Sequence, residues 1–183
     1  MKVLLLSIGL ALVCAIQAAA DVSGKPIQTE KLKGQWHTIS MATNEMKLIE
    51  KDGTMRFFFK TVTPRNTDEL IVTMLKEENN KCTEYNLVIK QTEEPNKFRP
   101  VPFTDNKRNL IIMADTDYLN YALVVIQHYD KELDREVTVV QCLSRTLEVT
   151  PEVVEKFNKL LKDYNISEKN VINMNNEKDI CRL

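Results

Sequence analysis

The residue types that most often do chemistry are scarce in this chain. Its two histidines, His37 and His128, have no cysteine or acid beside them at the spacing of metal ligands. The adjacent acids Glu77-Glu78 and Glu93-Glu94 are typical of solvated turns and not of a paired acid and base. The nucleophile-elbow, phosphate-loop and HExxH motifs are absent from the sequence. We therefore expect no metal site, no cofactor and no enzyme activity.

The segment 1–20 has the form of a secretory signal peptide. Lys2 precedes the apolar run Val3–Val13, and the small residues Ala18-Ala19-Ala20 follow it. The apolar run is shorter than the ~20 residues that a membrane-spanning helix needs. We predict cleavage after residue 20, a single domain over 21–183, and secretion to the extracellular space.

The mature chain would carry 24 basic and 26 acidic residues, and this balance argues against nucleic acid as a partner. It would also keep three cysteines, Cys82, Cys142 and Cys181. In an oxidising compartment an odd count predicts one disulfide and one spare thiol, and the cysteine count alone allows three pairings. Asn165-Ile166-Ser167 is an acceptor pattern for N-glycosylation, so Asn165 is a predicted glycosylation site.

Most of the chain is predicted to form short β-strands, which would position the functional side chains. Apolar and polar residues alternate with a period of two, and turns such as Asn66-Thr67-Asp68 and Asn79-Asn80 separate the runs. Eight strands in hairpin order favour an all-β fold, an antiparallel up-and-down barrel that leaves no open edge. After a first strand at Trp36, the runs lie at 55–62, 70–74, 85–90, 97–103, 108–114, 118–128 and 136–143.

The pattern changes once, near the C-terminus. Thr150-Pro151-Glu152 predicts a helix start, with a capping hydroxyl, proline at the first helical position and an acid in the first turn. Because one face of this helix is apolar, we expect it to pack on the outer wall of the barrel. Val171–Asn173 could form a short closing strand. The apolar face consists of Val153, Val154, Phe157, Leu160, Leu161 and Tyr164.

Three local motifs occur in order along the chain: Gly34-Gln35-Trp36, Thr116-Asp117-Tyr118 and Arg145. Together with the signal peptide and the C-terminal helix, they resemble the three short motifs of the lipocalins, the small secreted eight-stranded calyx proteins. The resemblance covers residues 27–182, nearly all of the mature chain. It implies that the matching tryptophan plugs the closed end of the barrel and that the arginine lies across its ring. Trp36 would then be a structural floor and not a ligand contact.

The resemblance also assigns the cysteines. "VVQCLSRTLEVTPEVVEKF", residues 139–157, is similar to the β-lactoglobulin and glycodelin branch, whereas "NISEKNVINM", residues 165–174, is similar to the odorant-binding branch. The family's tail-to-barrel bridge corresponds to Cys82–Cys181. Cys142 matches the spare thiol of the first branch, and it should face outward because it is out of phase with its neighbours.

A calyx of this kind encloses an apolar cup, and the alternation predicts which side chains line it. Val139 and Leu143 would complete the wall, and Tyr85 and Gln141 are the polar groups that could orient a ligand's head group. The residues that we expect to face inward and bind the ligand are Met55, Phe57, Phe59, Leu70, Val72, Met74, Tyr85, Leu87, Ile89, Phe98, Ile111, Met113, Ala122, Val124 and Ile126.

These observations predict a secreted carrier of small hydrophobic molecules such as fatty acids, retinoids or odorants. The alternative is a nutritive or signalling glycoprotein that acts through its surface and is recognised by a cell-surface receptor. A homodimer is a separate expectation for the chain. A third hypothesis is an enzyme like the prostaglandin isomerases, which resemble lipocalins and use a cysteine on an early strand facing the cavity. Residues 55–62 contain no cysteine, so we do not expect this activity.

Overall fold

The computed structural model describes residues 26–102 and 109–181, so the predicted signal peptide lies outside it. These residues form one ten-stranded antiparallel sheet and one α-helix, α1 (Pro151–Asp163). None of the helices among them is long and apolar enough to cross a membrane. The strands are β1 (Gly34–Gln35), β2 (His37–Thr43), β3 (Phe58–Pro64), β4 (Glu69–Glu78), β5 (Lys81–Gln91), β6 (Lys97–Val101), β7 (Leu110–Thr116), β8 (Tyr121–Asp130), β9 (Arg135–Ser144) and β10 (Val171–Asn173). Short 3-10 helices lie at Thr29–Leu32, Met46–Leu48, Glu168–Asn170 and Met174–Asn176.

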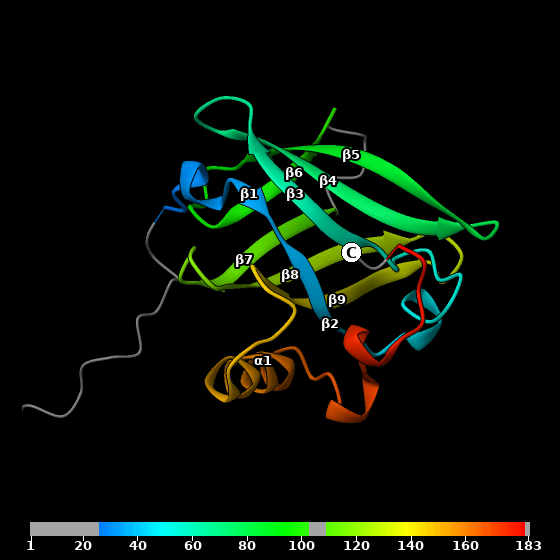
Figure 1. Ribbon diagram of the computed structural model, residues 1–183. Helices are drawn as coiled ribbons and strands as arrows, with labels where there is room; N and C mark the ends of the chain where they lie inside the picture. Colours follow the sequence, from blue (N-terminus) through cyan, green and yellow to red (C-terminus); the bar gives the residue numbers. More distant parts are fainter. Residues whose placement is uncertain (1–25, 103–108, 182–183) are drawn as a thin grey trace, which may run out of the picture.

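The predicted first strand closes the barrel, because its two halves pair with strands at opposite ends of the sheet. It is interrupted at Trp36, where β1 pairs with β3 (Gly34 opposite Val62) and β2 pairs with β9 (His37 opposite Ser144). The strand order is β1-β3-β4-β5-β6-β7-β8-β9-β2-β10. Counting β1 and β2 as one strand and setting β10 aside leaves the eight strands that the sequence predicts, in the predicted up-and-down order. Figure 1 shows the sheet curling around an interior, with α1 outside it.

A β-bulge in β3 changes which of its side chains face inward. Phe59 pairs with Met74, but the register shifts before the next pair, so that Val62 lies opposite Val72. A strict alternation from Phe59 would place Thr61 on the inner face and Val62 outside, and this expectation is wrong. The bulge turns Val62 into the interior, where it is only 6% exposed.

Helix α1 packs on the outer face of the barrel, as its apolar stripe predicts (Figure 1). Val153, Phe157 and Leu161 are buried in a cluster with outward-facing side chains of β7, β8, β9 and β2. Pro151 occupies the first turn as expected. The prediction of a capping hydroxyl is wrong, because Thr150 makes no side-chain capping hydrogen bond to the described residues.

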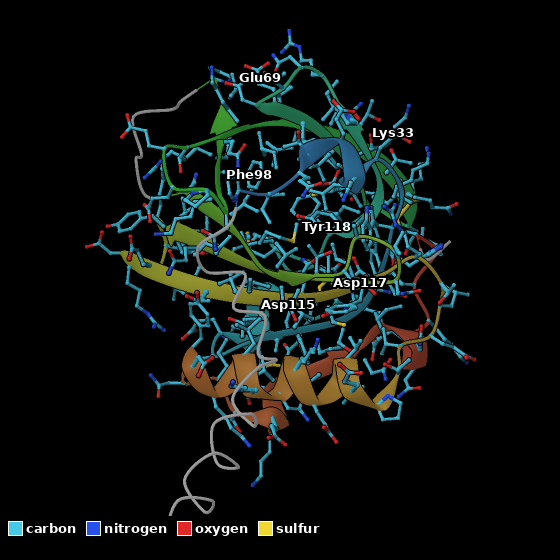
Figure 2. The ribbon with its side chains drawn as sticks, turned by 90° about the vertical axis from the view of Figure 1, so that its left-hand side faces the viewer. Lys33, Glu69, Phe98, Asp115, Asp117 and Tyr118 are labelled. Atoms are coloured by element: carbon cyan, nitrogen blue, oxygen red, sulfur yellow. A yellow bond between two sulfur atoms is a disulfide. The ribbon has the colours of Figure 1, made fainter. Side chains whose placement is uncertain are left out.

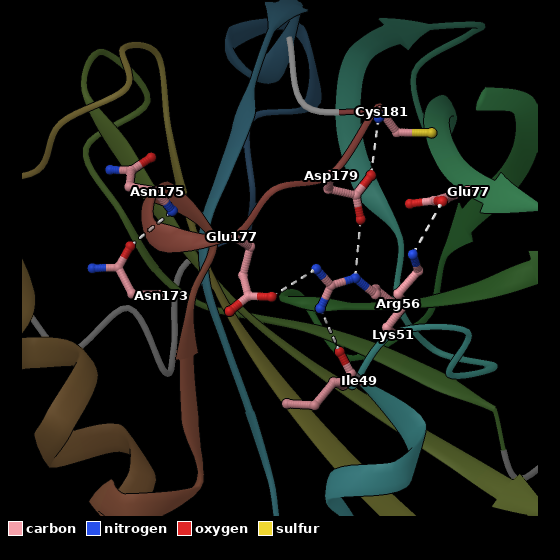
Figure 3. A network of polar contacts seen from close by, with 9 residues as sticks. All are labelled: Ile49, Lys51, Arg56, Glu77, Asn173, Asn175, Glu177, Asp179 and Cys181. Atoms are coloured by element: carbon pink, nitrogen blue, oxygen red, sulfur yellow. Dashed lines mark hydrogen bonds and ion pairs between the residues drawn. The ribbon is translucent and has the colours of Figure 1, made fainter. Parts of the chain in front are cut away.

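The C-terminal segment is fixed to the barrel by a covalent bond and by an ion pair. The disulfide Cys82–Cys181 confirms the predicted pairing, with 5.1 Å between the Cα atoms and a separation of 99 residues. Beside it, the buried Arg56 donates from Nε to Asp179 (3.1 Å) and from Nη1 to the carbonyl of Ile49 (2.9 Å). Figure 3 shows this network, in which Glu177 lies 3.5 Å from the same guanidinium.

Candidate ligand cavity and its floor

Trp36 and Arg145 together seal one end of the barrel. The Cζ atom of Arg145 lies 3.7 Å from the centroid of the Trp36 ring, and the indole Nε1 donates to the carbonyl of Leu32 at 2.8 Å. Gly34 has a φ of +113°, and a Cβ atom there would lie 3.1 Å from Nη1 of Arg145. The glycine is therefore needed both for its backbone conformation and for the close approach of the guanidinium.

The Thr116-Asp117-Tyr118 turn completes this end of the barrel (Figure 2). Oδ1 of Asp117 accepts from the backbone amides of Asn120 (2.7 Å) and Tyr121 (3.0 Å). Burial favours the neutral acid, but these hydrogen bonds outweigh it and lower the pKa of Asp117. The carbonyl of Tyr118 accepts from Nε and Nη2 of Arg145, which ties the turn to the floor.

Above this floor lies a cavity of about 140 Å³. No charged side chain lines it among the described residues, and Gln141 and the Trp36 indole supply the polar side-chain groups of the wall. The lining residues are Leu32, Trp36, Met55, Phe57, Phe59, Val62, Leu70, Val72, Met74, Leu87, Ile89, Phe98, Ile111, Met113, Ala122, Val124, Ile126, Gln141 and Leu143. Such a cavity suits a small apolar molecule better than an ion, because an unpaired charge is costly to bury.

Known proteins of similar sequence belong to a family whose fold agrees with this barrel and its cavity. Residues 33–178 match the Lipocalin / cytosolic fatty-acid binding protein family. This chain belongs to the lipocalin family. It is 30% identical to lipocalin Can f 6.0101 of Canis lupus familiaris, over 95% of this chain and 89% of the relative. It is 31% identical to beta-lactoglobulin-2 of the same species, over 74% and 82%.

The fold of this lipocalin also matches solved structures. The possum milk whey lipocalin trichosurin, solved at pH 4.6 with bound 4-ethylphenol, superimposes with a TM-score of 0.71. The match covers 81% of this chain and 99% of trichosurin, at 21% sequence identity. At this level of identity the likeness shows a shared fold.

The lining of the lipocalin cavity contains every residue of the predicted ligand-binding set except Tyr85. The phase of Tyr85 is inward, since it pairs with Met74, but its side chain is 36% exposed and lies outside the cavity wall. Val139 is also inward but belongs to a separate buried cluster, so its expected place in the wall is wrong. Trp36 was expected to avoid ligand contact, yet it forms part of the wall together with Leu32.

Tyr85 belongs instead to a polar cluster at the edge of the cavity. Its ring packs edge-on against Phe57, with 5.8 Å between centroids, and its hydroxyl donates to Oε2 of Glu78 at 2.6 Å. This hydrogen bond to the carboxylate raises the pKa of Tyr85. Lys76 lies 4.0 Å from Glu78 and 5.2 Å from the Phe57 ring. The hydroxyl of Tyr85 is thus engaged outside the cavity, and it does not orient a head group within it.

Cys142 lies on the opposite side of the barrel wall from the cavity. It is 2% exposed and packs in the cluster that contains Phe157 and Leu161 of α1, which confirms its predicted outward phase. Burial raises the pKa of its thiol to about 12, so the thiolate is disfavoured. A thiol in this place cannot act on a molecule in the cavity. Among residues 26–102 and 109–181, no three His, Cys, Asp or Glu side chains are grouped closely enough to hold a metal ion.

Proposed function

We propose that this lipocalin is a secreted carrier of small apolar molecules, which it holds in the barrel cavity. The observation that carries the proposal is the apolar wall, in which Gln141 is the one polar side chain without a hydrogen-bonding partner among the described residues. Burying apolar ligand surface gains about 25 cal/mol per Å², and the costs of association offset part of this gain. Affinity for a well-fitting ligand is then expected to be roughly micromolar.

The size of the cavity narrows the choice of ligand. An apolar cavity of about 150 Å³ is known to hold a molecule as small as benzene, and the cavity here measures about 140 Å³. We infer that compact odorant-sized molecules with a single ring fit without rearrangement. Fatty acids and retinoids are longer, and they would have to displace lining side chains such as Met55 or Met74. The 4-ethylphenol bound in trichosurin is a compact molecule of the favoured kind.

Isothermal titration calorimetry with 4-ethyltoluene tests this function on the mature, disulfide-bonded chain. We expect one molecule to bind per chain and dodecanoate to bind more weakly. Met74→Trp should abolish binding, because the larger indole would occupy the cavity. Thr73→Trp is the matched control, since Thr73 faces outward on the same strand and hydrogen-bonds Asn86. The carrier proposal is wrong if neither compound binds saturably, or if Met74→Trp binds as the wild type does. Tighter binding of dodecanoate than of 4-ethyltoluene would overturn the size limit.

We infer an extracellular location from the Cys82–Cys181 disulfide, because such bonds persist in oxidising compartments. Asn165 is exposed just after α1, which leaves it accessible to glycosylation. Intact mass spectrometry of the secreted protein would test both the cleavage after residue 20 and a glycan at Asn165. The surface-acting alternative predicts that the native protein is isolated without a ligand and still binds cells. A receptor stays a prediction of that alternative, and a homodimer stays a separate prediction.

A further inference from the structure

Gln141 is a buried polar side chain whose hydrogen bonds are unmade. It is 1% exposed, and neither Oε1 nor Nε2 has a hydrogen-bonding partner among the described residues. Buried polar groups in folded proteins are nearly always paired, because an unpaired one retains its full cost of leaving water. An unpaired amide in the wall of a ligand cavity therefore requires an explanation.

The neighbours of Gln141 in the sheet offer its side chain no partner. On β9 it lies opposite Val124 of β8 and Met41 of β2, and both are apolar and buried. Two residues along the strand, Leu143 also lines the cavity. On this inner face Gln141 forms part of the cavity wall.

The other polar groups near the cavity are already engaged. The indole N–H of Trp36 donates to the carbonyl of Leu32. The hydroxyl of Thr38 accepts from the amide of Phe59 at 2.9 Å, and the hydroxyl of Tyr85 is bonded to Glu78 outside the cavity. Within the part of the chain that the structure describes, Gln141 is thus the polar side chain of the wall that is available to a ligand.

We propose that Gln141 binds a hydroxyl group of the ligand, so that the cavity selects small alcohols and phenols. This inference rests on the carrier function proposed above. A carboxamide both accepts and donates hydrogen bonds, and a hydroxyl group does the same, so one hydroxyl can satisfy both ends of the amide. A hydrocarbon leaves the amide unpaired. A carboxylate would be buried without a counter-charge, since no cationic side chain lines the cavity among the described residues.

The test compares three ligands of one shape by titration calorimetry at pH 7. The ligands are 4-ethylphenol, 4-ethyltoluene, which replaces the hydroxyl with a methyl group, and 4-ethylbenzoate. We expect the wild type to bind 4-ethylphenol about tenfold more tightly than 4-ethyltoluene, and 4-ethylbenzoate more weakly than either. In Gln141→Met, which keeps the length of the side chain but not its amide, the two uncharged ligands should bind within about twofold of each other.

Gln127→Met is the matched control, because Gln127 lies on the adjacent strand β8 outside the cavity wall. It should keep the tenfold preference. Equal binding of 4-ethylphenol and 4-ethyltoluene to the wild type would overturn the role of Gln141, for instance because a water molecule already satisfies the amide, and would leave the carrier function intact. Failure of all three ligands and of dodecanoate to bind would instead reject the carrier function. The preference of the wild type for 4-ethylphenol over 4-ethyltoluene tests the proposal even if Gln141→Met does not fold. Gln141→Leu provides a second variant without the amide.

Discussion

The guanidinium of Arg145 stacks on the ring of Trp36, with Cζ 3.7 Å from the ring centroid. The same group donates to the carbonyls of Gln35 (2.9 Å), Lys31 (3.2 Å) and Tyr118 (3.1 Å). One side chain therefore joins the segment before β1, the start of the first strand and the turn between β7 and β8. The turn is far from the other two segments in sequence, so the contact closes the floor of the barrel and should matter for stability.

Replacing Arg145 with methionine should lower the free energy of unfolding by about 3 kcal/mol. The change removes a cation–π contact worth about 0.5–2 kcal/mol and the hydrogen bonds that the charged guanidinium donates to three backbone carbonyls. Arg145→Lys should cost less, because the ammonium keeps the charge but cannot reach several carbonyls at once. Urea denaturation at pH 7 measures both values.

Arg135→Met is the control for loss of an arginine. Arg135 pairs with Glu45 on the surface, with 55% of its side chain exposed, and such pairs contribute at most about 1 kcal/mol. If Arg145→Met destabilises the protein no more than Arg135→Met does, the floor contact has no special role.

Substitutions at Arg56 and Asp179, which form a buried ion pair, should have strongly non-additive effects on the free energy of unfolding. Arg56→Met leaves the Asp179 carboxylate, 3% exposed, without its partner, and breaking a buried pair in this way costs about 3–5 kcal/mol. Adding Asp179→Asn should recover part of the loss, because no uncompensated charge then remains. The free energies of unfolding of the wild type, both single variants and the double variant give the coupling directly. Additive losses would show that the pair does not hold the C-terminal segment.

The sequence predicts the inner face of the barrel well because side chains alternate with a period of two in any strand. Leu87, Val72 and Val124 were placed correctly on this basis. Periodicity gives the face of the sheet but not the residue of each strand at which the cavity ends. For this reason Tyr85 and Val139 have the predicted inward phase and still lie outside the cavity wall.

Two further errors have local causes. Val62 was missed because a β-bulge shifts the register, and the sequence of β3 contains no glycine to mark it. The Thr150 hydroxyl was expected to cap α1, but residue type predicts a helix start without fixing the side-chain rotamer. The contact between Trp36 and Arg145 at the floor was predicted from the resemblance to a known family. That resemblance rests on the motifs Gly34-Gln35-Trp36, Thr116-Asp117-Tyr118 and Arg145, and the spacing of these motifs alone does not predict the contact.

Stability should fall at alkaline pH through Cys142. Burial raises the pKa of its thiol from an ordinary 9.0 to about 12 in the folded protein. Its contribution is fully present below pH 9, where the thiol is protonated in both states, and is lost as the pH rises toward 12, since the unfolded chain then releases a proton that the folded one retains. At about pH 10.5 the loss should reach roughly 2 kcal/mol.

Cys142→Ala isolates this effect, because tyrosines and lysines also titrate in the same range. The variant should lose about 2 kcal/mol less than the wild type between pH 8 and pH 10.5 in urea denaturation. Parallel pH profiles for the two proteins would show that the folded thiol ionises as readily as the unfolded one.

Gln141→Met should make the ligand-free protein more stable, although most substitutions in a barrel interior destabilise. The amide of Gln141 has no partner among the described residues, and an unpaired buried polar group costs about 1–3 kcal/mol. Methionine keeps a similar length, removes this cost and packs against Val124 and Met41. We therefore expect the free energy of unfolding to rise by about 1 kcal/mol without ligand. At one excess concentration, 4-ethylphenol should then stabilise the wild type more than the variant, because the stabilisation rises with the logarithm of the affinity. If Gln141→Met destabilises the ligand-free protein, the amide has a structural partner and is not available to bind a ligand.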